Sequence, residues 1–226
     1  MPTLYVVATP IGNLSDMSPR AIETLRSVQL IAAEDTRVTM KLLNAFDIST
    51  PLTSCHEHNE RSKAVQIAER MLAENIDVAV TTDAGTPCIS DPGSVLVREA
   101  TERGIPAVAV SGPTAMASAL SVSGMDISEF TFYGFLPRQK NELREKLTDM
   151  ARHSKIAVVH ESPHRVIELL QQVQAVLPHT FVSASCDLTK KFEQTLRGPV
   201  EQVLRLLEEN PKADKGEYCL CLRWAE

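Results

Sequence analysis

The sequence predicts an α/β fold in two domains, each built on a mostly parallel or mixed sheet flanked by helices. At 226 residues, the chain exceeds the usual size of one small domain. Short runs of apolar, often β-branched residues alternate with helical patterns along the whole chain, which is typical of parallel sheets. A stretch rich in Ser, Gly and Ala at 112–124 interrupts this rhythm. We therefore expect domains at 1–113 and 114–226.

The first half alternates strands and helices in order. Apolar runs predict strands at 4–8, 29–33, 77–81 and 107–110. Ser18 followed by Pro19 is a typical helix start, with an apolar stripe at Ile22, Leu25 and Val28. Further helices are expected at roughly 60–75, 93–103 and 114–123. The apolar face of the helix at 60–75 is expected at Val65, Ala68, Met71 and Leu72.

The second half restarts the pattern. Strands are expected at 130–133, 155–160, 181–185, 194–197 and 217–223, with helices at 138–152 and 200–209. Ser162 and Pro163 repeat the cap-plus-proline start of the first helix, so another helix is expected to begin there. No repeat of 20–50 residues is visible, which argues against a solenoid.

Composition and charge exclude several classes of protein. The net charge of −6, from 23 basic and 29 acidic residues, excludes a polybasic coat for nucleic acid but not a local basic patch. No apolar run approaches the ~18 residues that span a bilayer, and no charged-then-apolar leader is seen at Met1-Pro2-Thr3, so neither a membrane span nor secretion is expected. Five cysteines without CxxC spacing indicate reduced thiols in a cytoplasmic protein, with neither a disulfide framework nor a zinc site.

Basic residues gather in the second half. The segment 138–155 holds six of them against three acids, and Lys190, Lys191 and Arg197 form a second group. The six are Arg138, Lys140, Arg144, Lys146, Arg152 and Lys155. They form either a solvated helix face or a platform that contacts phosphates.

Four loops are rich in Gly, Pro and small polar residues and follow expected strands, at 9–13, 82–87, 111–115 and 160–165. In a parallel sheet, ligands bind beyond the carboxyl ends of the strands, so these loops are candidates for a binding site. The chain lacks GxGxxG, GxxxxGK[ST] and GxSxG, which argues against a Rossmann dinucleotide site, a P-loop and a hydrolase elbow. The run Cys55-His56-Glu57-His58 has no second ligand pair, so a metal site is not expected.

Two adjacent carboxylates, Glu34 and Asp35, stand at the end of the second expected strand. Either could act as a general base, a hydrogen-bond acceptor for substrate, or an N-cap for the helix that begins at Thr36. The cap suits Asp35. Glu34 lacks so simple a role, and a carboxylate buried at a strand end tends to be paired or functional.

Seven ordered motifs closely resemble those of the ribosomal RNA small subunit methyltransferase I family, a branch of the tetrapyrrole-methylase-like (class III) methyltransferases. They are LYVVATPIGNL at 4–14, AEDTR at 33–37, DAGTPCISDPG at 83–93, SGPT at 111–114, GFLP at 134–137, ESPHR at 161–165 and LTKKFE at 188–193. The resemblance implies two α/β domains with S-adenosylmethionine held in the cleft between them. It also implies methylation of the ribose 2′-hydroxyl of a cytidine in the decoding region of 16S rRNA, by a homodimer acting on small ribosomal subunits. No metal is expected.

The resemblance also assigns site residues by motif position. The cofactor would contact Pro10, Asp83, Ala84, Gly85, Ser111, Thr114, Ala115, His160 and Leu188. Glu34 would be the general base or the acceptor of the hydroxyl proton. The substrate would be held by Asp35, Arg37, His56, His58, Arg165, Lys190 and Lys191. The chain departs from the family at His160, where an aromatic residue is usual, and at Asp187, where Glu is usual.

Two other functions remain open at this stage. The first is a methyltransferase on the same fold that acts on a tetrapyrrole or another small molecule, although such a substrate would not need the basic segment at 138–155. The second is a non-catalytic ribosome-binding factor, against which the intact Gly, Pro and Asp motifs argue.

Overall fold

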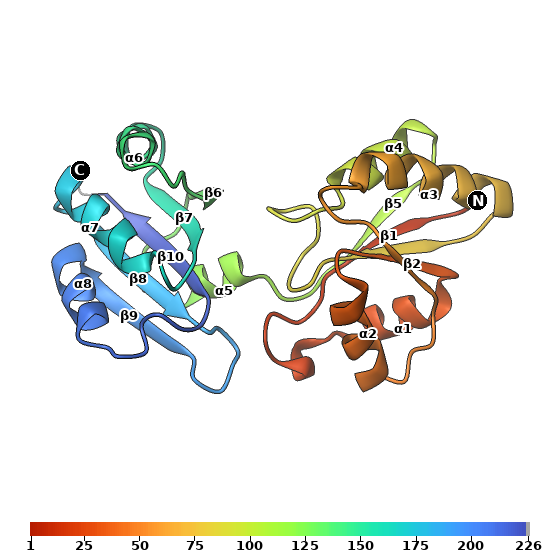
Figure 1. The fold of residues 1–226 in the computed structure, drawn as a ribbon, viewed down its shortest axis with the longest axis horizontal. Coiled ribbons are helices and arrows are strands. Elements are labelled where there is room, and N and C mark those ends of the chain that lie inside the picture. The colour runs from red at the N-terminus through yellow and green to blue at the C-terminus, as the bar shows by residue number, and fades with distance from the viewer. Residues whose placement is uncertain (225–226) are drawn as a thin grey trace. The chain divides into compact units, whose positions relative to one another are not determined.

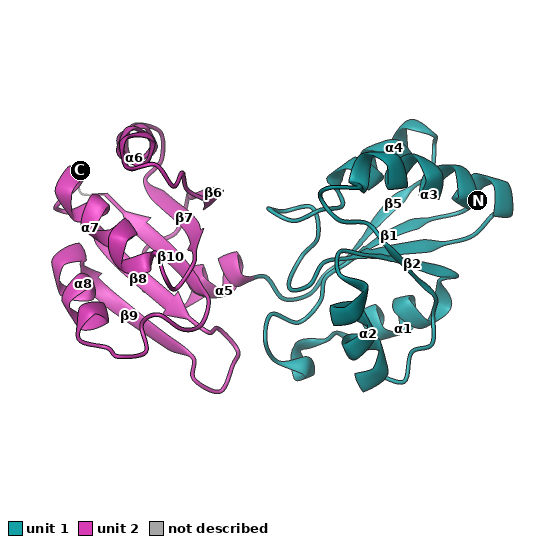
Figure 2. Ribbon diagram, in the orientation of Figure 1, with its two compact units in different colours: residues 1–114 teal, residues 115–226 magenta. Residues whose placement is uncertain are grey.

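The computed structural model describes residues 1–224, and Figure 1 shows them as a ribbon. The chain divides into two compact units, which Figure 2 colours separately. Unit 1 is Met1–Thr114 and unit 2 is Ala115–Glu226. No helix within residues 1–224 combines the length and the apolar character needed to cross a membrane.

Unit 1 is a five-stranded sheet in the order β3-β2-β4-β1-β5, and every neighbouring pair is parallel. The strands are β1 (Leu4–Val7), β2 (Leu30–Ala33), β3 (Leu52–Ser54), β4 (Val78–Thr81) and β5 (Ala107–Val110). The helices are α1 (Pro19–Ser27), α2 (Thr36–Ala45), α3 (Glu60–Glu74) and α4 (Ser94–Glu102), with a 3₁₀ turn η1 (Leu14–Asp16). The alternating pattern therefore predicted this unit well, except that β3 was not expected.

Helices cover both faces of this sheet. Leu25 of α1 and Leu43 of α2 pack with Ile31 on one face. Met71 of α3 and Leu96 of α4 pack in a separate core on the other face. Because β2 and β4 are buried at every position, their sequences are continuous apolar runs, apart from Thr81, rather than alternating ones, as is typical of central parallel strands.

The predicted apolar face of α3 is correct at Ala68 and Met71 and wrong at Val65 and Leu72. The buried positions are Ala64, Ile67, Ala68 and Met71, together with Glu60, whereas Val65 is half-buried and Leu72 is 47% exposed. The small side chain at Ala64 is fully buried in the core that α3 shares with α4. A pattern that ranks residues by hydrophobic size passes over such an alanine.

Unit 2 is a five-stranded mixed sheet in the order β6-β7-β10-β8-β9. The strands are β6 (Thr131–Phe135), β7 (Ile156–Glu161), β8 (Phe181–Cys186), β9 (Gln194–Pro199) and β10 (Tyr218–Arg223). Among the residues up to 224, β6 and β7 are the one parallel pair of this sheet, and β10 runs antiparallel between β7 and β8. The helices are α5 (Ala115–Ser121), α6 (Lys140–His153), α7 (Val166–Val176) and α8 (Val200–Glu208).

The expected helix start at Ser162 and Pro163 is also wrong, because α7 begins at Val166 with Arg165 as its N-cap. The carbonyl of Ser162 accepts from the amides of Arg165 (2.9 Å) and Val166 (3.1 Å), which closes a turn ahead of the helix. At α1, by contrast, the Ser18 hydroxyl accepts from the Ala21 amide at 3.1 Å and caps the helix as predicted.

Candidate functional site

The loops after β1 and β4 are joined at the carboxyl edge of the unit 1 sheet. The amide of Thr9 donates to the carbonyl of Gly85 at 2.8 Å, and the amide of Gly85 donates back to the carbonyl of Thr9 at 3.0 Å. The Thr9 hydroxyl adds a bond to the carbonyl of Thr82 at 3.2 Å. Gly85 has φ +86°, a conformation that favours glycine, and this permits the tight approach of the two loops.

This edge contains a topological switch point. The chain leaves β1 and β2 for helices on one face of the sheet, whereas it leaves β4, which lies between them, for a helix on the other face. The loops that follow β4 and its two neighbours therefore diverge and leave a crevice. Ligands of open α/β sheets bind at such crevices.

Glu34 stands at this point with one oxygen already engaged. Its Oε2 accepts from the Thr82 hydroxyl at 2.5 Å and from the Asp83 amide at 3.1 Å. Thr82 is buried and Glu34 is half-buried. Within residues 1–224, Oε1 of Glu34 takes part in no hydrogen bond, so this oxygen is placed to accept a proton or a hydrogen bond from a ligand.

Asp35 is the N-cap of α2, as the sequence predicted. Its Oδ1 accepts from the Arg37 amide at 2.8 Å, and its carboxylate pairs with the Arg37 guanidinium at 2.6 Å. These hydrogen bonds lower the pKa of Asp35 to about 2. The Arg37 side chain is 87% exposed, so its outer nitrogens can contact solvent or a ligand while it pairs with Asp35.

Asp83 and Asp91 complete an acidic field around Glu34. Asp83 Oδ1 accepts from the Asp35 amide at 3.1 Å, and desolvation and the charges of Glu34 and Asp35 raise the pKa of Asp83. Burial, followed by the charges of Glu34 and Asp83, raises the pKa of Asp91 to about 6. Neighbouring carboxylates that hinder one another's ionisation favour a positively charged ligand.

A cavity of about 280 Å³ lies beside these carboxylates. Its walls come from the loop after β1, from α2 and from the end of β4, and include Pro10, Leu14, Val38, Leu42, Thr82 and Asp83. Most of the lining is apolar, so the cavity fits an apolar or aromatic group adjacent to the acidic field.

The other predicted residues of unit 1 lie at the ends of neighbouring strands. The Cys55 amide bonds to the Ala33 carbonyl at 2.7 Å, which sets His56 and His58 beyond β3, next to the strand that leads into Glu34. Within residues 1–224, no three His, Cys, Asp or Glu side chains gather as a metal site.

Ser111 and Thr114 follow β5, and the Thr86 hydroxyl donates to the Pro113 carbonyl at 3.3 Å, which ties this loop to the loop after β4.

The remaining predicted cofactor residues belong to unit 2. His160 lies on β7 with its ring centroid 5.1 Å from Phe132 and 5.8 Å from Phe135. Burial lowers the pKa of His160, so the imidazole is neutral near pH 7. Ala115 opens α5. Leu188 is only 7% exposed, so a ligand would contact mainly its backbone.

The predicted basic contacts differ in availability. Lys190 is held by Glu217 at 2.9 Å and by Asp187 at 3.1 Å, while Lys191 is exposed. Arg165 bonds to the Pro137 carbonyl at 3.2 Å and pairs with Glu161 at 3.5 Å. Lys190 and Arg165 therefore have less freedom than Lys191 to contact a substrate.

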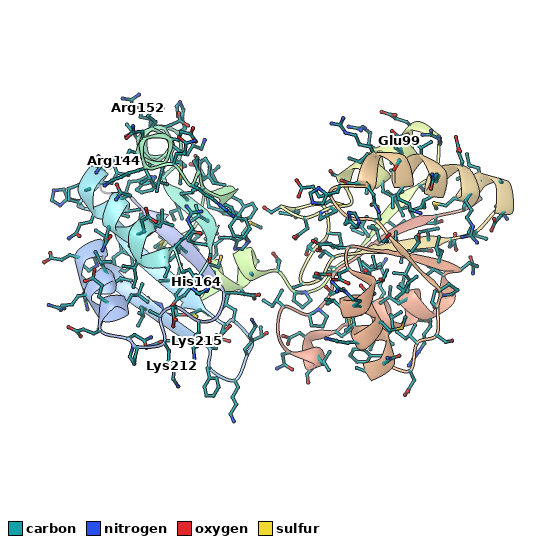
Figure 3. All side chains as sticks on the ribbon, viewed as in Figure 1. Glu99, Arg144, Arg152, His164, Lys212 and Lys215 are labelled. Atoms are coloured by element: carbon teal, nitrogen blue, oxygen red, sulfur yellow. The ribbon has the colours of Figure 1, made fainter. Side chains whose placement is uncertain are left out.

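The basic segment around α6 is divided in the same way. Arg144 bonds to Gln172 at 2.8 Å and Lys146 pairs with Asp149 at 3.3 Å. Arg138, Lys140 and Arg152 are exposed and form no ion pair within residues 1–224. Figure 3 labels Arg144 and Arg152 on this helix.

The sequence analysis assigned no role to Thr82 or Asp91. Asp91 lies inside one of the motifs that carry the resemblance, and this position could have identified it. Thr82 opens the candidate loop 82–87, but its bond to Glu34 could not be predicted because the two residues are 48 apart in the sequence.

Comparisons with known proteins agree with this architecture. A model of the tetrapyrrole (corrin/porphyrin) methylases matches residues 3–204. Over 218 residues the chain is 44% identical to a ribosomal RNA small subunit methyltransferase I of Halalkalibacterium halodurans, covering 96% of this chain and 74% of that protein. A Bacillus subtilis protein of the same name is 42% identical over 220 residues, covering 97% of this chain and 74% of its own length.

Solved structures with similar folds have far lower sequence identity. A diphthine synthase matches with a TM-score of 0.75 at 12% identity, covering 98% of this chain and 90% of its own. The methyltransferase CobJ matches with a TM-score of 0.69 at 16% identity, covering 100% of this chain and 95% of its own. Together with the family model, the match to CobJ shows that this chain has a tetrapyrrole methylase fold.

Proposed function

The chain belongs to the tetrapyrrole methylase family and, within it, to the ribosomal RNA small subunit methyltransferase I group, and from this premise we propose that it 2′-O-methylates a cytidine of 16S rRNA. The observation that carries the proposal is the identity of 42–44% to relatives of that name over nearly the whole chain. The finer assignment, to a ribose in the decoding region, follows the resemblance of the seven motifs.

The methyl donor in this proposal is S-adenosylmethionine, which supplies an electrophilic methyl group on a positively charged sulfur. The chain's own residues fit such a group. Glu34, Asp83 and Asp91 create a negative field at the switch point, suited to a cationic ligand. In unit 2, a neutral His160 beside two phenylalanine rings suits the flat adenine ring.

The holding residues in this proposal come from both units. Pro10, Asp83, Ala84, Gly85, Ser111 and Thr114 would supply contacts from unit 1, and Ala115, His160 and Leu188 from unit 2. Ala84 and Ser111 are exposed at the ends of β4 and β5, so their backbone groups are accessible to the amino-acid end of the donor. The proposal needs no metal ion.

Glu34 acts as the general base. Thr82 and the Asp83 amide fix its Oε2, so Oε1 is presented in one orientation to the ribose hydroxyl. Accepting the proton as the oxygen attacks makes this weakly acidic hydroxyl a better nucleophile, an effect typically worth about 10²–10⁴-fold. Holding the hydroxyl in line with the methyl group supplies much of the remaining acceleration.

The substrate is held by polar groups, of which Arg37, His58 and Lys191 are exposed. Asp35, Arg37, His56 and His58 lie at the ends of β2 and β3, the strands next to Glu34, and suit contacts to sugar or phosphate. Arg165, Lys190 and Lys191 add contacts from unit 2, of which Lys191 has the most exposed side chain. The proposal includes action on assembled small ribosomal subunits, as a homodimer in the cytoplasm.

Methyl transfer from labelled S-adenosylmethionine to unmodified small ribosomal subunits tests this function, with naked rRNA alongside and the 2′-O-methyl position mapped afterwards. We expect label on one cytidine of the decoding region. If the protein binds S-adenosylmethionine but labels neither substrate, the acceptor is not this RNA and a small-molecule acceptor becomes the better explanation.

A further inference from the structure

Phe192 exposes its ring to solvent on an ordered loop. Its side chain is 74% exposed, the highest value for a large apolar residue in residues 1–224 apart from Met1. It lies between β8 and β9 in the segment 187–193, which we call the β8–β9 loop. The proposed mechanism assigns no role to this ring.

Hydrogen bonds hold the β8–β9 loop in one shape. The Thr189 amide donates to Glu193 Oε2 at 2.6 Å, and the Glu193 amide donates to the Lys190 carbonyl at 3.1 Å. Lys190 pairs with both Asp187 and Glu217 at the base of the loop. The loop therefore presents the ring outward on a fixed frame.

Two lysines flank the ring. The ammonium groups of Lys191 and Lys212 lie 5.6 Å and 5.8 Å from its centroid. Neither forms an ion pair within residues 1–224, in contrast to Lys190. Figure 3 labels Lys212 and Lys215 on the segment that joins α8 to β10. Exposed positive charge therefore borders an exposed aromatic face.

We propose that Phe192, Lys191 and Lys212 form a stacking platform for an unpaired base of RNA. A base stacks on the ring and displaces an ammonium, which remains within reach of the adjoining phosphate. Sequence-specific recognition of RNA relies chiefly on such splayed-out bases. This inference rests on the proposed function for its choice of RNA.

The surroundings of the ring favour RNA over a lipid surface. Its loop neighbours Thr189, Lys190 and Glu193 are polar, so the loop offers one isolated ring rather than a broad apolar face. Membrane-surface binding scales with the apolar area that can be inserted, and one ring gives little. A single aromatic face, in contrast, suits one base.

Binding of unmodified small ribosomal subunits and of a short single-stranded oligoribonucleotide tests the platform in the full-length protein. We expect Phe192→Leu to weaken both by about 5- to 100-fold, the usual worth of one stacked base. Phe192→Trp should retain binding, and RNA should quench the fluorescence of the new indole above the background of Trp224. Lys191→Gln and Lys212→Gln should each reduce the slope of log affinity against log salt by about 0.7.

The matched control is Phe130→Leu, which removes another exposed phenylalanine ring of unit 2, one that is 43% exposed. We expect it to bind RNA like the unaltered protein, and S-adenosylmethionine affinity should be unchanged in every variant. Equal RNA binding by Phe192→Leu and Phe130→Leu would overturn the platform, as would a Phe192→Leu variant that loses binding to phosphatidylglycerol vesicles but keeps its affinity for RNA.

The binding measurement and the methyl-transfer assay together separate the platform from the proposed reaction. If Phe192→Leu weakens subunit binding while the unaltered protein places no methyl group on a ribose, the platform stands and the proposed reaction fails. If methyl transfer occurs on the expected cytidine and Phe192→Leu binds normally, the reaction stands and the platform fails.

Discussion

Glu34 depends on two donors for its orientation, and one of them is a buried hydroxyl. Thr82 is 2% exposed, and its bond of 2.5 Å to Glu34 Oε2 is short for two oxygens. The Asp83 amide bonds to the same oxygen. The two oxygens of one carboxylate thus have different surroundings, which is what a base with a fixed direction of attack requires.

Glu34→Gln tests the base directly. The amide oxygen can still accept from Thr82 and Asp83, so the local structure should persist, while the amide nitrogen faces the ligand and cannot accept a proton. We expect single-turnover methyl transfer to fall by about 10²–10⁴-fold with S-adenosylmethionine affinity unchanged. A loss below about tenfold at unchanged affinity would exclude the base role.

Thr82 should be a positioning residue for Glu34. Thr82→Val keeps the shape but removes a donor that orients the carboxylate, so kcat should fall by about tenfold while the KM for small subunits is unchanged. Thr82→Ser keeps the hydroxyl and should restore kcat. A purely structural role for Thr82 would lower the urea midpoint of Thr82→Val and leave the kcat of the folded protein unchanged.

Asp91 should make unfolding depend on pH. Its pKa is raised to about 6 in the folded protein, so the folded state binds more protons than the unfolded state, and stability falls as pH rises from about 4 to 6. Asp91→Asn should remove this loss and raise the free energy of unfolding at pH 7 by about 1–2 kcal/mol, after allowance for screening by solvent. Urea unfolding at pH 5 and pH 7.5 checks this. A larger gain at pH 5 than at pH 7.5 would contradict the assignment.

At the scale of elements, the N-terminus of α4 is capped by a carboxylate of α3. Oε1 of Glu60, which is 8% exposed, accepts from the amides of Gly93 (2.7 Å) and Val95 (3.0 Å). The N-cap residue Gly93 has no side chain to do this, and a Cβ there would lie 2.9 Å from the Cys88 sulfur. The two helices are therefore coupled at this end of the sheet.

Glu60→Ala should destabilise unit 1 by about 2–3 kcal/mol, because two helix amides lose a charged acceptor, and one of those bonds is buried. Glu60→Gln keeps an acceptor and should cost about half as much. Urea unfolding measures both. The control is Glu74→Ala, which removes an exposed carboxylate from the same helix and should cost less than about 0.5 kcal/mol. Equal costs for Glu60→Ala and Glu74→Ala would disprove the capping role.

Local patterns predicted most elements but not their partners. Ser18 capped α1 and Asp35 capped α2 as expected, because each signal lies within four residues of the amide that it bonds. The capping carboxylate of α4 could not be predicted, since Glu60 lies 33 residues before Gly93. The direction of β10 was equally hidden, because its buried run from Tyr218 to Leu222 looks like a parallel core strand.

The candidate site was predictable to the same extent. A general rule for parallel sheets brought the loops after β1, β4 and β5 to one edge, and the structure joins them there through Thr9, Gly85 and Pro113. The rule gives no information about which side chains touch. The pairing of Lys190 with Glu217, which occupies a predicted substrate contact, joins residues 27 apart and needed coordinates.

At the scale of the molecule, each unit has its own core, and the proposed donor contacts come from both. A ligand that binds only the folded protein stabilises what it contacts, by about 2.7 kcal/mol at 100 times its dissociation constant. Trp224, the one tryptophan of the chain, packs against the core of unit 2, so its fluorescence reports the unfolding of that unit.

Excess S-adenosylmethionine should therefore raise the unfolding midpoint measured by Trp224 fluorescence as well as the midpoint measured by far-UV circular dichroism, which reports both units. The physical reason is that both units supply contacts in the proposed site. A shift seen by circular dichroism, with the Trp224 transition unmoved, would confine the donor site to unit 1.

The central position of β10 sets an order of events during synthesis on the ribosome. β7 and β8 each pair with β10 and not with one another, so before Tyr218–Arg223 is made, unit 2 has only the two-stranded pairs β6–β7 and β8–β9. Two-stranded ribbons are marginally stable alone. Unit 1 has all its strands by Val110 and can fold while the rest is still being translated. The nascent chain should thus complete its acidic crevice well before the sheet that carries the β8–β9 loop.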